Sequence, residues 1–127
     1  MALKTVDFSG HSDLYQGPGE NTVKIKMKGS RGADFTKAYK KAGIKGSVKT
    51  QVDSQYTWHH MHDFDPNTGE TTMQLVKTKT HEASLPHKGS VSQFEKFTGT
   101  KYESFEAKEF AHNKGWRSKK PRLKCKS

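Results

Sequence analysis

Histidines gather in one short part of this sequence. Five of the seven histidines fall within a single stretch of the chain: His59, His60, His62, His81 and His87. Imidazole is the commonest protein ligand for metal ions, and histidine is the general base best matched to neutral pH. A single histidine is more often structural than functional, so the clustering carries the prediction of a metal-binding or water-activating site. The role of His62 stays open, and we expect no site role for His11 or His112.

The adjacent pair His59 and His60 lies in a segment that is rich in strand-forming residues. Successive side chains of a strand point to opposite faces, so the two rings should meet different surroundings. This arrangement would allow one histidine to bind a metal ion while its neighbour activates a nearby water molecule. His81 and His87 are too far apart to share one helix face, and they converge only if a helical turn breaks at Pro86.

The histidine cluster falls on a predicted β-hairpin and on the segment directly after it. Residues 54–61 and 71–76 have the composition of strands, and residues 65–69 between them carry a dense turn signal. After the hairpin, either Thr78 or Thr80 can cap a short helix that carries the fourth histidine of the cluster. Together these segments predict two strands followed by a helix.

Further elements are predicted before the hairpin. Residues 22–28 alternate apolar residues with lysines, which indicates a half-buried strand with a lysine-rich outer face. Residues 34–42 place their apolar side chains on one stripe and are typical of a short helix. Asp34 is the expected N-cap of this helix, and Gly43 is the expected C-cap.

Helices and a basic tail are predicted after the hairpin. The segment 90–93 matches a capping box, so a helix should begin at its second residue and turn Phe94 and Phe97 inward. Residues 102–111 form another helical stretch. Residues 114–127 are rich in lysine and arginine and are expected to form a basic tail.

Composition and charge restrict the class of partner. The 127 residues fit one domain over 1–127, with 30% hydrophobic residues and a mean hydropathy of -1.00. Lysine and arginine outnumber aspartate and glutamate by 23 to 13, giving a net charge of +10, which favours a polyanion such as nucleic acid. No apolar run is long enough to span a bilayer, so a membrane is not the expected partner. The single cysteine, Cys125, excludes an internal disulfide and a cysteine-based zinc site.

The order of the motifs resembles that of a known family. The motifs that carry the resemblance are Asp34-Phe35, Ala38, Ala42-Gly43, Trp58-His59-His60, Thr72-Met73-Gln74-Leu75-Val76, His81 and Pro86-His87-Lys88-Gly89-Ser90. They resemble the WHH family of HNH/endonuclease VII nucleases, which occur as C-terminal toxin domains of bacterial polymorphic and contact-dependent secretion systems. The resemblance covers about residues 22–95.

The resemblance implies an α+β fold with a ββα-metal core, also called an HNH or His-Me finger, over residues 54–95. A strand and short helix would precede this core, and further helices would follow it. By motif position, His59 would be a metal ligand and His60 the general base. His81, at the start of the α element, would be a second ligand, and His87 a third ligand or a phosphate contact.

The activity implied by the resemblance is metal-dependent hydrolysis of phosphodiester bonds, most simply by a DNase with weak sequence preference. His60 would take a proton from water, and the products would carry a 5′-phosphate and a 3′-hydroxyl. The metal would be one divalent ion. Nitrogen ligands favour zinc, nickel or another late transition metal, while manganese and magnesium stay open because many HNH enzymes use magnesium. Activity of a histidine base should fall as the pH drops through about 6.5, the unperturbed histidine value.

Six basic residues are expected to hold the phosphates without reading sequence: Lys24, Lys26, Arg31, Lys77, Lys79 and Lys88. Three alternatives to a DNase stay open. These are a ribonuclease, which could work without metal, a non-catalytic nucleic-acid-binding module held together by a metal, and a basic structural protein with incidental histidines. Cleavage assays on DNA and RNA, with and without a chelator, discriminate among them.

The toxin interpretation also carries expectations about partners and location. The chain should act as a monomer, and the producing cell should hold a cognate, acidic immunity protein that binds rapidly through electrostatic steering. Met1-Ala2-Leu3-Lys4 has no apolar h-region, so no signal peptide is expected in this fragment. The domain would be delivered to the cytoplasm of a target cell.

Overall fold

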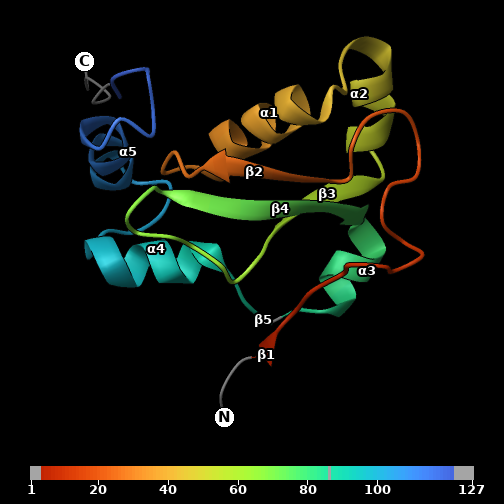
Figure 1. Ribbon diagram of the computed structural model, residues 1–127, viewed down its shortest axis with the longest axis horizontal. Helices are drawn as coiled ribbons and strands as arrows, with labels where there is room; N and C mark the ends of the chain where they lie inside the picture. The colour runs from red at the N-terminus through yellow and green to blue at the C-terminus, as the bar shows by residue number, and fades with distance from the viewer. Residues whose placement is uncertain (1–3, 86, 122–127) are drawn as a thin grey trace, which may run out of the picture.

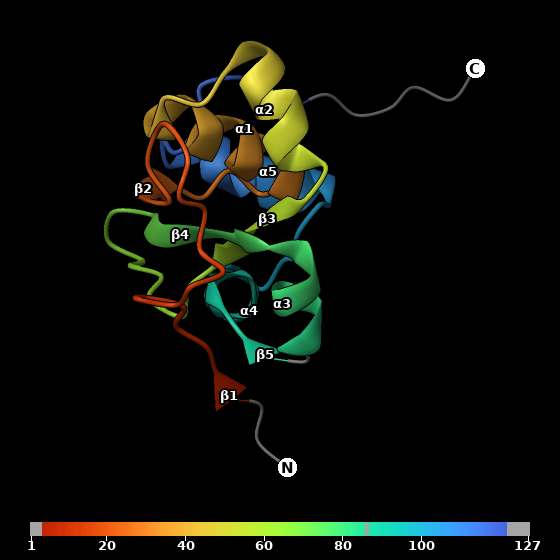
Figure 2. The same cartoon turned by 90° about the vertical axis from the view of Figure 1, so that its right-hand side faces the viewer.

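The centre of the computed structural model, which describes residues 4–85 and 87–121, is a three-stranded antiparallel sheet in the order β2-β4-β3. The elements in chain order are β1 (Lys4–Thr5), β2 (Thr22–Lys26), α1 (Arg31–Ala42), α2 (Gly46–Asp53), β3 (Tyr56–His60), β4 (Glu70–Lys77), α3 (Thr78–Ala83), β5 (His87–Lys88), α4 (Ser90–Thr98) and α5 (Phe105–Asn113). Helices α1 and α2 lie on one face of the sheet, and α3 and α4 lie on the other (Figure 1, Figure 2). The mixed α+β fold with a ββα core is therefore confirmed.

The hairpin of β3 and β4 places the two adjacent histidines. The strands pair antiparallel, with His59 opposite Gln74 and His60 opposite Met73. Strand β3 lies at the edge of the sheet, because β4 pairs with β2 on its other side. The end of β3 is therefore bordered by another strand on one side only.

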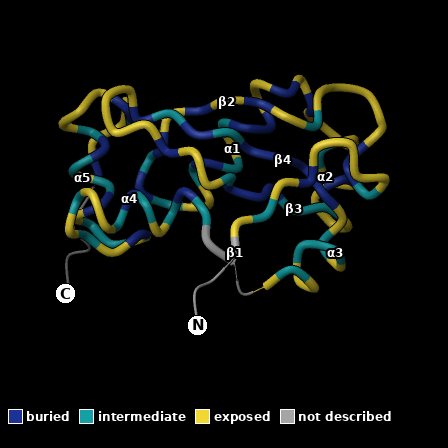
Figure 3. The backbone as a smooth tube through the Cα atoms, turned by 60° about the horizontal axis from the view of Figure 1, so that its bottom comes forward, coloured by how far each residue is buried: buried dark blue, intermediate teal, exposed yellow. Residues whose placement is uncertain are grey.

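Strand β2 forms the opposite edge of the sheet and shows the predicted alternation. Val23 and Ile25 are buried, while Lys24 and Lys26 are exposed. The apolar side chains join the core beneath α1, where Ala38, among others, is fully buried. Figure 3 shows buried residues along the strands and exposed residues on the loops and outer helix turns.

The helix caps differ from the predicted ones. Helix α1 begins at Arg31, and Ser30 is its N-cap, since the Ser30 hydroxyl accepts a hydrogen bond from the Ala33 amide. The prediction of Asp34 as N-cap is wrong, because Asp34 lies inside the first turn and its carboxylate points into the protein. The C-cap is Gly43, as predicted, with a left-handed φ of 75°.

The caps predicted for the later helices are also wrong. Lys77 is the N-cap of α3, so neither threonine caps this helix, and His81 lies in its last turn rather than at its start. Gly89 is the N-cap of α4 and no side chain caps it, because the Gln93 amide oxygen accepts a hydrogen bond from the Phe64 amide instead. The sequence pattern of a capping box is therefore present, but its hydrogen bonds do not form.

One predicted boundary and one inward side chain also differ from the structure, and one helix was not predicted. Helix α5 begins at Phe105 with Ser104 as N-cap, so Tyr102 precedes it. Phe94 is buried as predicted, but Phe97 is 49% exposed. Helix α2 is not evident from the sequence, because Val52 is its one buried residue and gives no apolar stripe.

The first residues of the predicted basic tail are part of a second core. Trp116 is buried, and its ring packs against Phe64, Phe94 and Phe110 at centroid separations of 5.9, 6.2 and 5.8 Å. This core joins α4 and α5 to the turn of the hairpin. Residues 122–127 of the tail lie outside the described residues.

Replacing Trp116 with alanine should lower the free energy of unfolding by about 3–5 kcal/mol, the usual cost of deleting a large buried aromatic side chain. Urea unfolding followed by circular dichroism measures the change. Phe97→Ala is the control, because its half-exposed ring buries less surface. Equal destabilisation of the two variants would contradict the described core.

Within the described ranges, no helix is long and apolar enough to span a membrane.

Candidate active site

A cleft with a volume of about 480 Å³ opens at the edge of the sheet beside β3. Side chains from both helical layers line it: Arg31 and Phe35 come from α1, His81 from α3, and Glu95 from α4. His60, at the end of β3, lines the same cleft. The cleft therefore brings together parts of the chain that are far apart in sequence.

His60 is held by a buried carboxylate. Its Nε2 lies 2.9 Å from Oδ2 of Asp34, and Asp34 is fully buried. A carboxylate can only accept a hydrogen bond, so Nε2 carries the proton and Nδ1 is the basic nitrogen of the neutral ring. Phe35 packs against the ring with 5.9 Å between the centroids. The ring is thus fixed in orientation as well as in tautomer.

The Asp34 carboxylate is itself held by two other donors. The Lys28 amide donates to Oδ1 at 2.9 Å, and the Tyr102 hydroxyl donates to Oδ2 at 2.5 Å. Burial and the neighbouring charge of Asp34 raise the pKa of Tyr102 well above its usual value, so the hydroxyl keeps its proton and acts as a donor. Asp34, His60 and Tyr102 form one buried polar network, which we call the Asp34 network.

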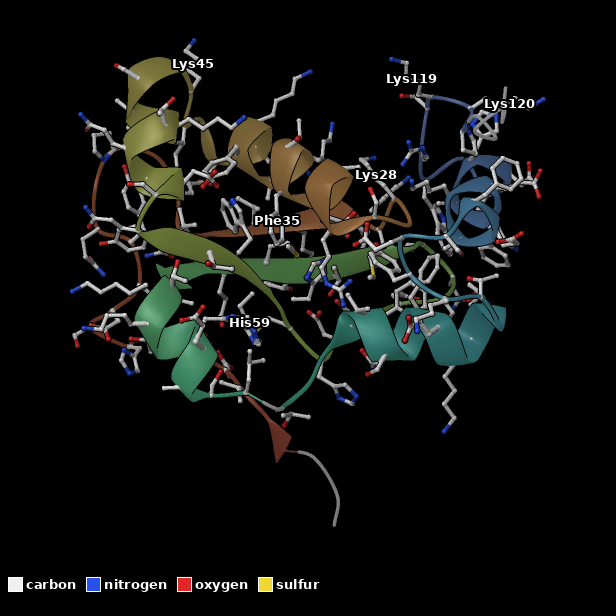
Figure 4. All side chains as sticks on the ribbon, turned by 180° about the vertical axis from the view of Figure 1, so that it is seen from behind. Lys28, Phe35, Lys45, His59, Lys119 and Lys120 are labelled. Atoms are coloured by element: carbon white, nitrogen blue, oxygen red, sulfur yellow. The ribbon has the colours of Figure 1, made fainter. Side chains whose placement is uncertain are left out.

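His59 points away from this network, to the opposite face of the sheet. Its Nε2 donates to the carbonyl of Val6 at 2.8 Å, and its ring packs against Phe8 and His81. The centroids of the His59 and His81 rings are 5.4 Å apart. Figure 4 shows the side chain of His59 on the α3 side of the sheet and Phe35 beneath α1. The two neighbours therefore face different surroundings, as the strand prediction required.

His59 and His81 lie close enough together that both could bind one metal ion. The Val6 carbonyl keeps the proton of His59 on Nε2, so Nδ1 is the nitrogen with ligand character, an arrangement common among metal-binding histidines. Among the described side chains, no group of three or more metal-ligating residues lies close enough to hold an ion. The third predicted ligand, His87, lies on β5, which pairs with β1, and its side chain is outside the described part of the chain.

The residues predicted to hold phosphates are spread over the molecule. Arg31 lines the cleft and pairs with Glu103 at 3.1 Å. Lys24 and Lys26 are exposed on β2, at the other edge of the sheet. Exposed Lys77 and Lys79 lie where β4 passes into α3, and the side chain of Lys88 is outside the described part of the chain. Of the five described side chains, Arg31 is the one that lines the cleft together with His60.

Sequence reasoning passes over two members of the site, Asp34 and Tyr102. An acidic residue early in a helix ordinarily indicates a cap, and a tyrosine in an aromatic segment ordinarily indicates core. The one available signal for Asp34 is its place before Phe35 in the family-like segment. The other histidines have ordinary surroundings: His62 is exposed, His11 packs against Phe8, and His112 donates to the Arg117 carbonyl.

Gly89 lies close to the backbone of His60, and this packing can be tested by substitution. A Cβ at Gly89 would lie 2.6 Å from the backbone oxygen of His60. Gly89→Ala should therefore push α4 away from β3, lowering stability by about 1–3 kcal/mol and slowing nucleic-acid cleavage. Gly32→Ala is the matched control, because its Cβ meets open space in α1. Thermal unfolding and cleavage rates check both variants, and unchanged values for Gly89→Ala would disprove the close approach.

The fold contains a ββα core, with two adjacent histidines at the end of its first strand. Residues 49–97 match the family model "WHH: A nuclease of the HNH/ENDO VII superfamily with conserved WHH". Residues 49–97 are therefore a WHH nuclease segment of this superfamily, and they include the hairpin, both central histidines, His81 and His87. No curated protein and no solved structure matches the chain.

The family assignment fixes the class of reaction. The protein is an HNH superfamily nuclease, a phosphodiester hydrolase, and its substrate is a nucleic acid. Nucleases of this superfamily typically use a divalent metal ion. Asp34 and Tyr102 lie outside the matched segment, so the surrounding chain supplies part of the site.

Proposed function

We propose that the protein is an endonuclease that cuts DNA with little sequence preference, with His60 as its general base. The observation that supports this role is the position of His60, at the wall of the cleft with Nε2 held by the buried Asp34 carboxylate. A base must be fixed in orientation and must keep one nitrogen able to accept a proton. His60 meets both conditions through the same hydrogen bond.

In the proposed reaction, Nδ1 of His60 takes a proton from a water molecule in the cleft. The oxygen of that water then forms a bond to the phosphorus of the substrate backbone, the bond from phosphorus to the 3′-oxygen breaks, and the departing 3′-oxygen takes a proton from solvent water. The products carry a 5′-phosphate and a 3′-hydroxyl. Asp34 stabilises the imidazolium that forms, because its carboxylate accepts a hydrogen bond from the Nε2–H throughout. Arg31, on the cleft wall, would contact the phosphate.

We propose His59 and His81, together with His87, as the residues that would hold one divalent ion beside the cleft. When bound, such an ion neutralises charge that develops on the phosphate oxygens. The donor set is entirely imidazole, which favours zinc or nickel over manganese and magnesium. The hydrogen bond to the Val6 carbonyl orients His59 for this role.

The biological setting that we propose is competition between bacteria. The domain would be the C-terminal toxin portion of a delivered effector and would act as a monomer in the cytoplasm of a target cell. An acidic immunity protein would protect the producing cell. Support comes from the net charge of +10 and from the toxin context of the WHH-like proteins that the sequence resembles.

Incubation of the purified protein with plasmid DNA and with tRNA tests the substrate assignment. Each reaction is run with magnesium, manganese, zinc or nickel, and again with EDTA. We expect nicked and linear plasmid in the presence of metal and no cleavage with EDTA. Cleavage of tRNA alone, or cleavage that resists EDTA, would replace the DNase proposal with a ribonuclease. Binding without turnover in every metal would mean a non-catalytic module.

A further inference from the structure

A second basic surface lies on the outer side of α1, away from the cleft. It is a groove of about 360 Å³ between α1 and the segment that follows α5. The cations that line this outer groove are Lys28, Lys37, Lys40, Arg117 and Lys119. Figure 4 shows Lys28 on the side of α1 that is nearest the segment carrying Lys119.

The groove is rigid because reciprocal hydrogen bonds tie its two walls together. Lys28 Nζ donates to the Trp116 carbonyl at 2.7 Å, and Arg117 Nη1 donates to the Lys28 carbonyl at 3.0 Å. Arg117 Nε also donates to the carbonyl of Lys119 at 3.0 Å. Trp116 anchors this segment in the second core. The walls of the groove are therefore held in position before any ligand binds.

These cations line one groove, and no described carboxylate lines it with them. Among the described residues that line it, none is acidic, and no ion pair of the described chain includes any of its cations. Burial, followed by the charge of Lys37, lowers the pKa of Lys28. Arg117 and Lys28 use some of their donors on backbone carbonyls and keep others for a ligand. A cluster of cations of this kind attracts an anion with several charges.

The groove and the cleft lie on different sides of the same helix. Arg31 and Phe35 face the cleft, whereas Lys37 and Lys40 face the groove. Successive residues of an α-helix are rotated by about 100° around its axis. Lys37 therefore lies about 200° around α1 from Phe35, and Lys40 lies about 140° from Phe35. A few nucleotides in the cleft would not reach the groove, whereas a long polynucleotide can contact both.

We propose that the outer groove is a second phosphate-backbone site, which holds a long nucleic acid while a distant phosphate is cut in the cleft. The inference rests on nucleic acid being the substrate, and it assigns five cations that the sequence analysis did not place on phosphates. Phosphate contacts of this kind bring affinity without base recognition. The effect should appear in the affinity for long substrates and not in the chemical step.

The binding test uses the double variant Lys37→Ala with Lys40→Ala, called the groove pair, in a His60→Ala protein so that the nucleic acid stays intact. Both lysines are on the outer side of α1, where alanine favours the helix. Lys101→Ala with Lys114→Ala is the control pair, since it removes the same charge from exposed positions outside the groove and cleft. Fluorescence anisotropy gives the affinity for a duplex of about 30 base pairs at several salt concentrations, because the salt slope reports the phosphates neutralised.

We expect the groove pair to weaken binding and to make the slope of log K against log salt less steep by about 0.9 for each phosphate that is no longer neutralised. The control pair should change the slope less. In a protein that retains His60, the groove pair should cleave a tetranucleotide at the parental rate and a plasmid more slowly. Equal slopes for the groove and control pairs would overturn the proposal.

Two other results separate this proposal from its alternatives. Parental DNA binding by the groove pair, together with weakened binding of poly-glutamate, would assign the groove to an acidic protein and overturn the nucleic-acid site. A parent protein that cleaves neither the plasmid nor the short substrate would contradict the proposed DNase itself. In that case the salt slopes would still report on the groove.

Discussion

The variant His60→Ala should lose between about 10²- and 10⁴-fold of its DNA cleavage rate, the usual contribution of a general base. The loss follows from the position of the ring in the cleft, with Nδ1 as the nitrogen that accepts a proton. DNA binding should persist, because the basic surfaces are unchanged. Plasmid nicking measures the rate, and anisotropy measures the affinity.

His62→Ala is the control for His60→Ala. His62 is exposed and lies in the same histidine-rich segment, so its removal should leave the rate unchanged. Plasmid nicking by His60→Ala at the parental rate would show that another group activates the water. A His62→Ala variant as slow as His60→Ala would contradict the assignment of His60 as the sole base.

The variant Asp34→Asn should lower kcat by on the order of 10²-fold, with KM nearly unchanged, because a misplaced base costs about that much. Asparagine can turn an amide nitrogen toward the imidazole, which removes the acceptor that keeps the proton on Nε2. Asp34 acts through His60, so it is a positioning residue. Steady-state kinetics well below the unfolding temperature separates kcat from KM.

Loss of structure is the competing explanation for a slow Asp34→Asn variant, because its carboxylate is buried and accepts three hydrogen bonds. Asp53→Asn is the control for losing a tyrosine hydrogen bond alone, since exposed Asp53 also accepts one from a tyrosine, Tyr39. The ¹⁵N chemical shifts of the His60 ring should report one tautomer in the parent and a mixture in Asp34→Asn. Parental shifts and kcat in a folded Asp34→Asn variant would exclude the positioning role.

The hairpin and the opposing directions of its two histidines were predictable from the sequence. Alternation along a strand is a local property, and turn residues between two strands fix their pairing. The half-buried strand β2 followed from the same rule, with Val23 and Ile25 buried and Lys24 exposed. These predictions needed no knowledge of how distant segments pack.

The Asp34 network could not be predicted in the same way. Asp34 reaches His60 because α1 packs on the sheet, and Tyr102 joins them from the loop before α5. Neither hydrogen bond leaves a periodic signal, because each depends on how separate elements dock. The burial of Trp116 was not predictable either. Its lysine-rich surroundings in the sequence indicate an exposed tail, although Trp116 is part of the second core.

A zinc titration tests most directly whether His59 binds the metal ion while His60 acts as the base. Isothermal calorimetry is performed on the parent, His59→Ala and His60→Ala, each first confirmed to be folded by circular dichroism. We predict that His60→Ala binds Zn²⁺ with the parental affinity, whereas the affinity of His59→Ala falls by about tenfold or more, as expected when a metal ligand is removed. Weakened Zn²⁺ binding in His60→Ala with parental binding in His59→Ala would contradict the claim.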